Sequence, residues 1–344
     1  MADDRNRNLP GLDLDVVGTF LRTHVDPHLG ACTGQVIAGG KSNMTYLVGN
    51  DHHRWIVRRP PLGHVLETAH DMGREARVMS ALAPTAVPVP QVLAVCGDPG
   101  PIGAPFYVME YVPGIAYRDE NELRALGADR TREIAHEMID VLADLHAVDP
   151  AAVGLGDLGR PEGFLGRQLS RWTRQLEASR SRELAGAEEL RAALAARVPG
   201  ESAARIVHGD YRLDNLLVDD SGVRAVIDWE MATTGDPLTD LALLVVYGRV
   251  AEIPGGEAIT TISRAPGFPS AAQLVERYVA RTGPLPSAGL GFYLGLAAFK
   301  LAVILEGIHL RHSQNHTVGA GFDTVGTLVE PLFGEGIALL KEWS

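Results

Sequence analysis

The sequence changes character near Pro113-Gly114, and this change limits the folds that the chain can adopt. Before this point short runs suited to β-strands predominate, and Gly49-Asn50-Asp51 between two of them is a strong hairpin signal. After it amphipathic helical patterns predominate, most clearly over residues 130–147. We therefore expect an α+β fold of two lobes: a small N-terminal antiparallel β lobe over residues 1–112 and a larger, mainly helical C-terminal lobe over residues 113–344.

Hydrophobic periodicity and turn residues locate the individual elements. Helices are predicted over residues 12–29, 71–82, 130–147, 167–179 and 187–198. Strands are predicted over residues 35–48, 53–58, 91–96, 106–112, 206–207, 216–218 and 224–227. The apolar run 292–308 is interrupted by Lys300 and Glu306, which favours a buried helix over a membrane span.

The composition excludes several classes of protein. Of the 344 residues, 46% are hydrophobic and 22% charged, as in ordinary folded proteins. The net charge of -12 argues against a general nucleic-acid binder. The two cysteines, Cys32 and Cys96, are too few for a disulfide framework, and the first residues carry no secretory signal pattern. We therefore predict a cytoplasmic protein that binds neither nucleic acid nor membranes.

The segment Gly40-Lys41-Ser42 contains part of a phosphate-binding P-loop motif but fails two of its requirements. The first glycine of the motif falls at Gln35, and the following residues are β-like where the motif needs a helix. Two interpretations stay open: a plain turn between strands, or a glycine turn whose backbone covers phosphates from above. On the second interpretation Gly40 and Ser42 are candidate nucleotide contacts.

Residues 207–230 carry the pattern most typical of catalysis. Asp210 and Asn215 have the D-x-x-x-x-N spacing of a kinase catalytic loop, and Asp228 follows a β run. In that chemistry one aspartate accepts the proton of an acceptor hydroxyl, while the asparagine and the second aspartate hold the metal ions that bridge nucleotide phosphates. Carboxylate and amide oxygens suit Mg. Each residue alone is typical of a turn or a strand end, so the prediction depends on their joint order.

These residues give the chain a resemblance to the aminoglycoside phosphotransferase and choline kinase-like family, small-molecule kinases with a protein-kinase-like fold. The matching strings are His208-Gly209-Asp210 with Asn215, Ile227-Asp228-Trp229-Glu230, and residues 235–242. More narrowly, the chain is similar to the kinase-like domains joined to some acyl-CoA dehydrogenases. That likeness is carried by residues 40–43, 57–61, 74–75, 87–90, 106–114 and 167–169, and the whole resemblance runs from about Val36 to about Arg311.

The resemblance implies a role for each catalytic position. Asp210 takes the place of the catalytic base, and Asn215 and Asp228 take the metal positions. Arg212 follows the base by two residues, where a cation stabilises the transferring phosphoryl group; the alternative is a surface salt bridge. His208 is expected to brace the loop rather than to bind metal.

The nucleotide contacts follow from the same resemblance. The hinge implies that the Glu110 carbonyl and the Val112 amide bind the adenine of ATP, with Mg as the metal and GTP not excluded. The family's phosphate-binding lysine is replaced by Arg58, whose partner on the next helix is Glu75. Strand alternation puts Arg58 and Arg59 on opposite faces, so only one of them points to the nucleotide, and the resemblance favours Arg58.

The acceptor is inferred from charge. The chain lacks the Asp-Phe-Gly glycine and a long activation segment after Asp228, which argues for a small-molecule kinase over a protein kinase. The elements expected to bind the acceptor are rich in cations, which suits an anionic or partly apolar acceptor such as a hydroxyacyl-CoA and implies a link to acyl-CoA metabolism. The alternative is that these cations lie on solvent-facing helix surfaces. They are Arg167, Arg171, Lys300, His309 and Arg311.

Several functions therefore stay open. The leading prediction is an ATP-dependent kinase that acts on a small-molecule hydroxyl. An aminoglycoside phosphotransferase, a nucleotide-binding pseudokinase and a Mg-dependent phosphohydrolase are the alternatives. The retained Asp210, Asn215 and Asp228 count against a pseudokinase, and the hinge-like strand counts against a phosphohydrolase. The sequence fixes neither the acceptor nor the oligomeric state.

Overall fold

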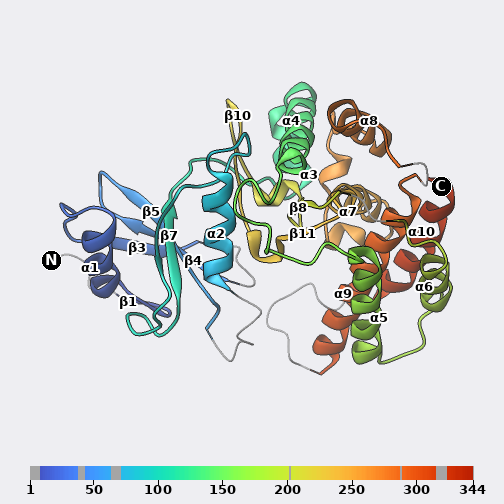
Figure 1. The fold of residues 1–344 in the computed structure, drawn as a ribbon, viewed down its shortest axis with the longest axis horizontal. Helices are drawn as coiled ribbons and strands as arrows, with labels where there is room; N and C mark the ends of the chain where they lie inside the picture. Colours follow the sequence, from blue (N-terminus) through green and yellow to red (C-terminus); the bar gives the residue numbers. More distant parts are fainter. Residues whose placement is uncertain are drawn as a thin grey trace. The chain divides into compact units, whose positions relative to one another are not determined.

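The chain forms two compact units. A computed structural model describes residues 8–37, 43–62, 71–200, 203–286, 289–314 and 324–343. The first unit comprises Met1–Gly114 together with Arg224–Ala232, and the second comprises Ile115–Val223 and Thr233–Ser344 (Figure 1). The short segment 224–232 therefore returns to the first unit after more than a hundred residues of the second.

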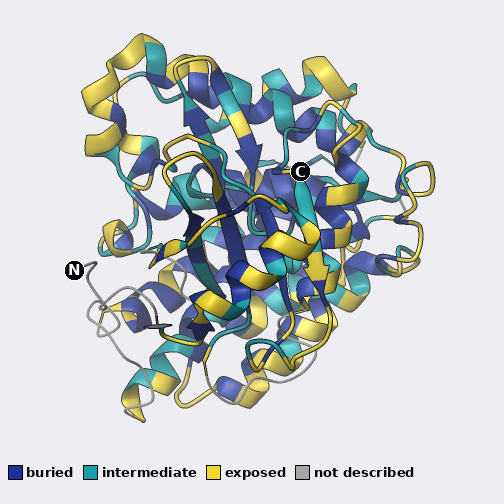
Figure 2. Ribbon diagram, turned by 90° about the vertical axis from the view of Figure 1, so that its left-hand side faces the viewer, coloured by how far each residue is buried: buried dark blue, intermediate teal, exposed yellow. Residues whose placement is uncertain are grey.

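The first unit is built on a five-stranded antiparallel sheet in the order β3-β4-β5-β7-β6. Its strands are β3 (Thr33–Val36), β4 (Met44–Gly49), β5 (Arg54–Arg59), β6 (Val92–Cys96) and β7 (Phe106–Glu110). The predicted hairpin is confirmed: Gly49 pairs with Arg54, and the Asn50 side chain accepts from the backbone amides of His52 and His53. The β-suitable run over residues 35–48 contains the end of β3 and most of β4, which pair with each other, in agreement with a turn between two strands here. Figure 2 shows the strands of this sheet largely in the dark blue of buried residues, with exposed turns in yellow.

Helices cover the two faces of this sheet. Helix α1 (Leu14–His24) starts at Asp13, whose carboxylate caps it, and packs Val17 and Leu21 against Val57 and other side chains of one face. Helix α2 (Met72–Leu82) is capped by Asp71 and contacts β6 and β7 (Figure 1). A small hairpin of β1 (Asn8–Leu9) and β2 (Leu12–Asp13) precedes α1. Both helices were predicted, although α1 is shorter than the pattern indicated.

The returning segment 224–232 packs on the same unit. It contains the end of β10 (Gly222–Val226) and the short helix η3 (Trp229–Met231), which contacts α2. Trp229 is fully buried, and its indole donates to the Val226 carbonyl. Asp228 is the one described non-glycine residue with a positive φ, at 68°.

The second unit is mainly helical. Its helices are α3 (Glu120–Leu126), α4 (Ala128–Ala147), α5 (Phe164–Ser179), α6 (Ala187–Ala195), α7 (Leu238–Val250), α8 (Ala271–Thr282), α9 (Gly291–Ser313) and α10 (Val329–Glu342). Short helices η2 (Leu213–Asn215), η4 (Gly256–Ala258), η5 (Ile262–Arg264) and η6 (Val325–Leu328) join them. Strands β8 (Arg205–Val207) and β11 (Thr233–Gly235) pair antiparallel, and β9 (Leu216–Asp219) follows η2.

Helix α9 is the core of the second unit. It packs against α5, α7 and α10, and most of its residues are buried. By length and composition it could cross a membrane, and it alone passes that test among the described helices. However, 83% of its most apolar window is buried inside the protein, as in the core helix of a folded unit. The prediction of a buried helix here is confirmed.

Candidate active site

Strand β5 directs its last two arginines to opposite faces of the sheet, as strand geometry requires. Arg59 donates to the backbone carbonyls of Gly11 and Ile102, so it serves the packing of the unit. Arg58 points the other way: its Nε lies 3.0 Å from a carboxylate oxygen of Glu75. Its terminal nitrogen also pairs with the carboxylate of Asp228. The predicted ion pair of Arg58 with Glu75 is confirmed.

Glu75 is the centre of this cluster. Its side chain is 2% exposed, so its charge depends on partners inside the protein. It accepts from the Tyr107 hydroxyl at 2.6 Å and from the Asn43 amide at 3.1 Å, besides pairing with Arg58. Burial by itself lowers the pKa of Arg58, but Glu75, Tyr107 and Asp228 together outweigh it and leave this pKa raised. The guanidinium is therefore charged throughout the working range of pH.

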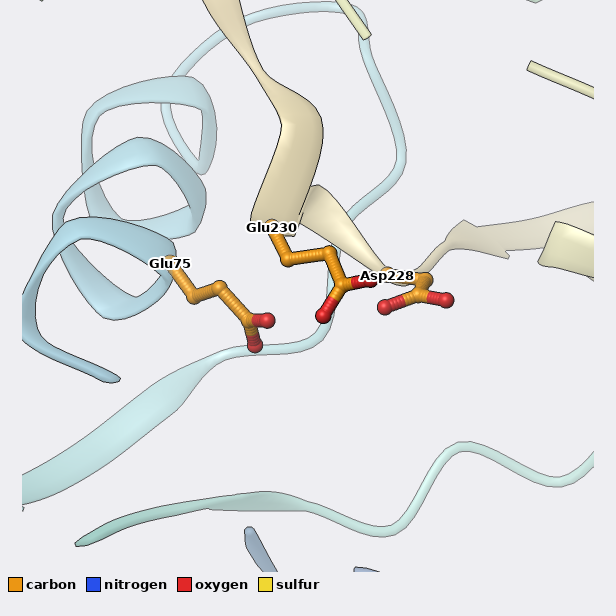
Figure 3. A group of neighbouring side chains, drawn as sticks. All are labelled: Glu75, Asp228 and Glu230. Carbon is orange, nitrogen blue, oxygen red and sulfur yellow. The ribbon is translucent and has the colours of Figure 1, made fainter. Parts of the chain in front are cut away.

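Three carboxylates gather beside Arg58. Oxygen atoms of Glu75, Asp228 and Glu230 lie within 4.8 Å of one another, from α2 and from the segment around η3 (Figure 3). Asn43 donates to both Glu75 and Glu230, at 3.1 Å each. Glu75 is engaged with Arg58 and Tyr107, whereas Asp228 is 28% exposed. The donor set is all oxygen and therefore fits Mg, with Asp228 and Glu230 only partly buried.

In the second unit, Asp240 holds the loop that follows β8. It lies in the first turn of α7, is fully buried, and accepts from the backbone amides of His208 at 2.7 Å and Gly209 at 2.8 Å. Burial by itself raises the pKa of Asp240, but His146, His208 and the Gly209 amide together outweigh it and lower this pKa. Asp240 therefore braces this loop through two of its backbone amides.

The loop presents Asp210 with both carboxylate oxygens engaged. The Tyr247 hydroxyl, from α7, donates to Oδ1 at 3.2 Å. The Asn215 amide donates to Oδ2 at 3.2 Å and to the Asp210 backbone carbonyl at 2.9 Å. The structure therefore brings Asp210 and Asn215 together. It also adds Tyr247, which lies 37 residues further along the chain and carries no motif by which the sequence could mark it.

Arg212 lies beside this loop in a fixed position. It forms an ion pair with Asp214, and its guanidinium stacks 4.5 Å from the centre of the Tyr247 ring. Its side chain is 19% exposed, so the pair is largely buried and not the surface salt bridge that was the alternative prediction. Burial raises the pKa of Asp214 and also that of Tyr247, so the tyrosine is a protonated donor.

Two of the predicted acceptor residues, Lys300 and Arg171, lie beside the same indole, and Lys300 also contacts the Asp210 loop. The Lys300 ammonium donates to the Gly209 carbonyl at 2.7 Å and lies 5.7 Å from the centre of the Trp172 ring. The Arg171 guanidinium lies 5.2 Å from the same ring. Burial lowers the pKa of Lys300, although Asp210 raises it in part. Lys300 therefore lies at the loop that carries Asp210, and Arg171 lies beside the indole that Lys300 also contacts.

The other predicted acceptor residues have different surroundings. Arg167 donates to the carbonyls of Glu162 and Arg160 and so fastens the segment before α5. His309 lies against Gly326, and Arg311 is exposed in the last turn of α9. Near His309, Arg182 donates to the Gly326 carbonyl and pairs with the buried Glu306 at 3.0 Å. The structure does not bring these three residues to the Asp210 loop.

The hinge residues lie where β7 ends. The Glu110 amide donates to the Gln91 carbonyl at 2.9 Å, and Val112 follows two residues later, partly exposed. Their contacts with adenine stay a prediction. Gly40 and Ser42 lie outside the described residues.

Comparison with known proteins identifies the family. The profile of the phosphotransferase enzyme family matches residues 33–278, and the chain belongs to this family. It is 35% identical over 298 residues to mouse acyl-CoA dehydrogenase family member 10, covering 85% of this chain and 28% of that protein. It is 32% identical over 342 residues to rat acyl-CoA dehydrogenase family member 11, covering 98% of this chain and 42% of that protein. The chain thus spans less than half the length of these curated relatives.

Solved structures agree on the fold. A putative aminoglycoside phosphotransferase from Ralstonia eutropha is 33% identical, with a TM-score of 0.83 over 96% of this chain and 99% of that one. Aminoglycoside phosphotransferase APH(4)-Ia, in a ternary complex with AMP-PNP and hygromycin B, is 16% identical, with a TM-score of 0.61 over 94% of this chain and 97% of that one. The fold is therefore the protein-kinase-like fold of the aminoglycoside phosphotransferases, in agreement with membership of the phosphotransferase enzyme family.

Proposed function

We propose that the protein is an ATP-dependent kinase that phosphorylates a hydroxyl group of a small molecule, with Asp210 as the general base. The observation that carries this proposal is the environment of Asp210: its carboxylate is oriented by Tyr247 and Asn215 on a loop that Asp240 braces. A base of this kind must be fixed in direction and yet able to take a proton.

The reaction assigns a task to each residue. The acceptor oxygen attacks the γ-phosphorus, and its proton passes to Asp210. The bond from the γ-phosphorus to the bridging oxygen breaks, and its electron pair stays on ADP. Asn215 and Asp228 would hold Mg, which neutralises the phosphate oxygens when bound. Arg58 would bind phosphate, and the Glu110 carbonyl and Val112 amide would bind the adenine.

We infer that the acceptor is anionic or partly apolar, with a hydroxyacyl-CoA as the leading candidate. Support comes from the two cations and the indole of Lys300, Arg171 and Trp172 near Asp210. The names of the curated relatives also favour a function linked to acyl-CoA metabolism. A polycationic aminoglycoside would be repelled by these cations, yet the 33% identical structure is described as a putative aminoglycoside phosphotransferase, so this acceptor class is the second candidate.

A transfer assay tests the proposal. The protein is incubated with γ-labelled ATP and Mg and a panel of acceptors: hydroxyacyl-CoAs, hygromycin B and kanamycin, choline, and sugars. We expect labelled product from a hydroxyacyl-CoA, and none with the Asp210→Asn variant as the matched control. Phosphate release that needs no acceptor would indicate a phosphohydrolase. Nucleotide binding by calorimetry without transfer or hydrolysis would indicate a pseudokinase.

A further inference from the structure

A cavity of about 300 Å³ lies inside the second unit, on the flank of the Asp210 loop. It is formed by residues 212–214, the second half of α7, η5 and the start of α8. Most of its wall is apolar, including Met138, Leu244, Val245, Ile262, Phe268 and Leu274. This volume is within the range of small-molecule sites, and such walls favour hydrocarbon over polar groups.

Apart from the exposed carboxylate of Glu252, the polar side chains in the wall are already engaged within the protein. Arg212 is paired with Asp214, and Arg249 is paired with Glu335 at 2.6 Å. The Ser263 hydroxyl donates to the Gly248 carbonyl. A charged ligand would gain little from these groups, because each is committed to a neighbour. The cavity therefore selects a neutral, apolar group.

Tyr247 connects this cavity to the catalytic loop. Its ring forms part of the wall, and its hydroxyl donates to Asp210 Oδ1 at 3.2 Å. The ring is held by the stacked guanidinium of Arg212. The Tyr247 side chain thus connects the cavity to the Asp210 carboxylate, because its ring lines the cavity and its hydroxyl points to that carboxylate.

We propose that this cavity binds the apolar part of the acceptor alcohol, and that Tyr247 is the positioning residue that aligns the acceptor with Asp210. The proposal rests on the proposed kinase function and adds to it the kind of group that the enzyme selects. Each methylene buried in such a pocket strengthens binding about fourfold. Acceptors with longer apolar chains are therefore the better substrates until the cavity is full.

Two neighbouring alanines provide a matched test. Ala271 lines the cavity in the first turn of α8, whereas Ala272 is exposed and does not line it. Ala271→Phe fills the cavity, and Ala272→Phe adds the same side chain to the same turn outside it. Circular dichroism and thermal unfolding confirm that both variants fold.

The first measurement is independent of turnover. Binding of 1-hexanol to the full chain is followed by saturation-transfer NMR. We expect binding to the wild type and to Ala272→Phe, and at least tenfold weaker binding to Ala271→Phe. Equal binding to all three proteins, or no binding to the wild type, would overturn the cavity as an apolar site, whatever reaction the enzyme performs.

The second measurement uses hydroxyacyl-CoAs of increasing chain length in the transfer assay. We expect kcat/KM to rise about fourfold per methylene in the wild type and in Ala272→Phe, and to stay flat in Ala271→Phe. A chain-length dependence that survives in Ala271→Phe would overturn the proposal and leave the kinase function intact. If no hydroxyacyl-CoA is phosphorylated, the proposed acceptor class fails, and the hexanol result still decides whether the cavity binds apolar groups.

Discussion

Two aspartates that we assign to phosphoryl transfer are held in different ways. In the first unit Asp228 is paired with the permanently charged Arg58, which also binds the buried Glu75. In the second unit Asp210 accepts hydrogen bonds from two neutral groups, the Tyr247 hydroxyl and the Asn215 amide. Both carboxylates are restrained, but only the first is neutralised by direct contact with a cation.

This difference matches the two proposed tasks. A carboxylate that must accept a proton should not lose a strong ion pair when it becomes neutral, and neutral donors avoid that cost. A carboxylate that must hold a metal ion stays negative, so a guanidinium can form an ion pair with it and later be displaced by the metal ion. The partners of each aspartate thus indicate whether it works as a base or as a ligand. The following variants test that distinction.

Asp210→Asn should have the largest effect. Removal of the base should lower kcat by about 100- to 10,000-fold, because the base takes up the acceptor's proton in the transition state. Nucleotide affinity, measured by calorimetry with Mg, should change little. If nucleotide affinity fell as far as turnover, Asp210 would be a binding residue and the comparison would fail.

Asp228→Asn should act on binding. Asparagine tolerates the positive φ of 68° at this position, so the backbone should keep its conformation. Mutation of a residue that only hydrogen-bonds to a metal ligand typically weakens metal binding by roughly 10- to 100-fold. Loss of the ligand itself should weaken Mg-dependent nucleotide binding by more than this. Calorimetry with and without Mg measures this. If Mg strengthened nucleotide binding as much in the variant as in the wild type, Asp228 would not be a metal ligand.

Arg58→Ala and Arg59→Ala form a pair of matched variants on one strand. Loss of a charge-assisted phosphate contact should weaken nucleotide binding about 10- to 100-fold in the first variant. Arg59→Ala loses hydrogen bonds to the Gly11 and Ile102 carbonyls, so it should lower thermal stability and leave nucleotide affinity nearly unchanged. The reverse result would show that the nucleotide meets the other face of the strand.

Tyr247→Phe should be milder, because it removes one neutral hydrogen bond and keeps the ring. A bond of this kind is worth about 0.5–1.5 kcal/mol, which corresponds to a roughly 2- to 10-fold lower kcat. Nucleotide affinity should be unchanged. If Tyr247 only stabilised the fold, its replacement would not be expected to spare nucleotide affinity while lowering kcat. An unaltered kcat with a normal acceptor KM would show that Asn215 orients Asp210 without help.

Lys300→Met should have the smallest effect, visible in the pH dependence of stability. Burial lowers the pKa of Lys300 from its ordinary 10.5, so in the interval below 10.5 the unfolded chain binds more protons than the folded one. The wild type should therefore gain stability relative to Lys300→Met as the pH rises toward 10.5. Chemical denaturation at several pH values measures this, and a parallel course of the two proteins would contradict it.

The sequence predicted those features of the site that depend on residues close to one another in the chain. Arg58 and Arg59 had to lie on opposite faces because they are neighbours in a strand, and Glu75 is on the next helix. Asp210 and Asn215 share one short loop. In contrast, Lys300 donates to a carbonyl 91 residues away, and only packing of the helices brings it there. Residue types alone could not separate it from Arg167, which fastens the chain just before its own helix.

The separation of Asp228 and Asp210 between two units is also a matter of chain topology. The chain passes from one unit to the other three times, because Arg224–Ala232 belongs with Met1–Gly114. In a hybrid of two related proteins joined near residue 114, the first unit would combine residues 1–114 of one parent with residues 224–232 of the other. The second piece includes the fully buried Trp229. Recombination between distant members of this family should therefore yield folded hybrids only when both pieces of the first unit come from the same parent.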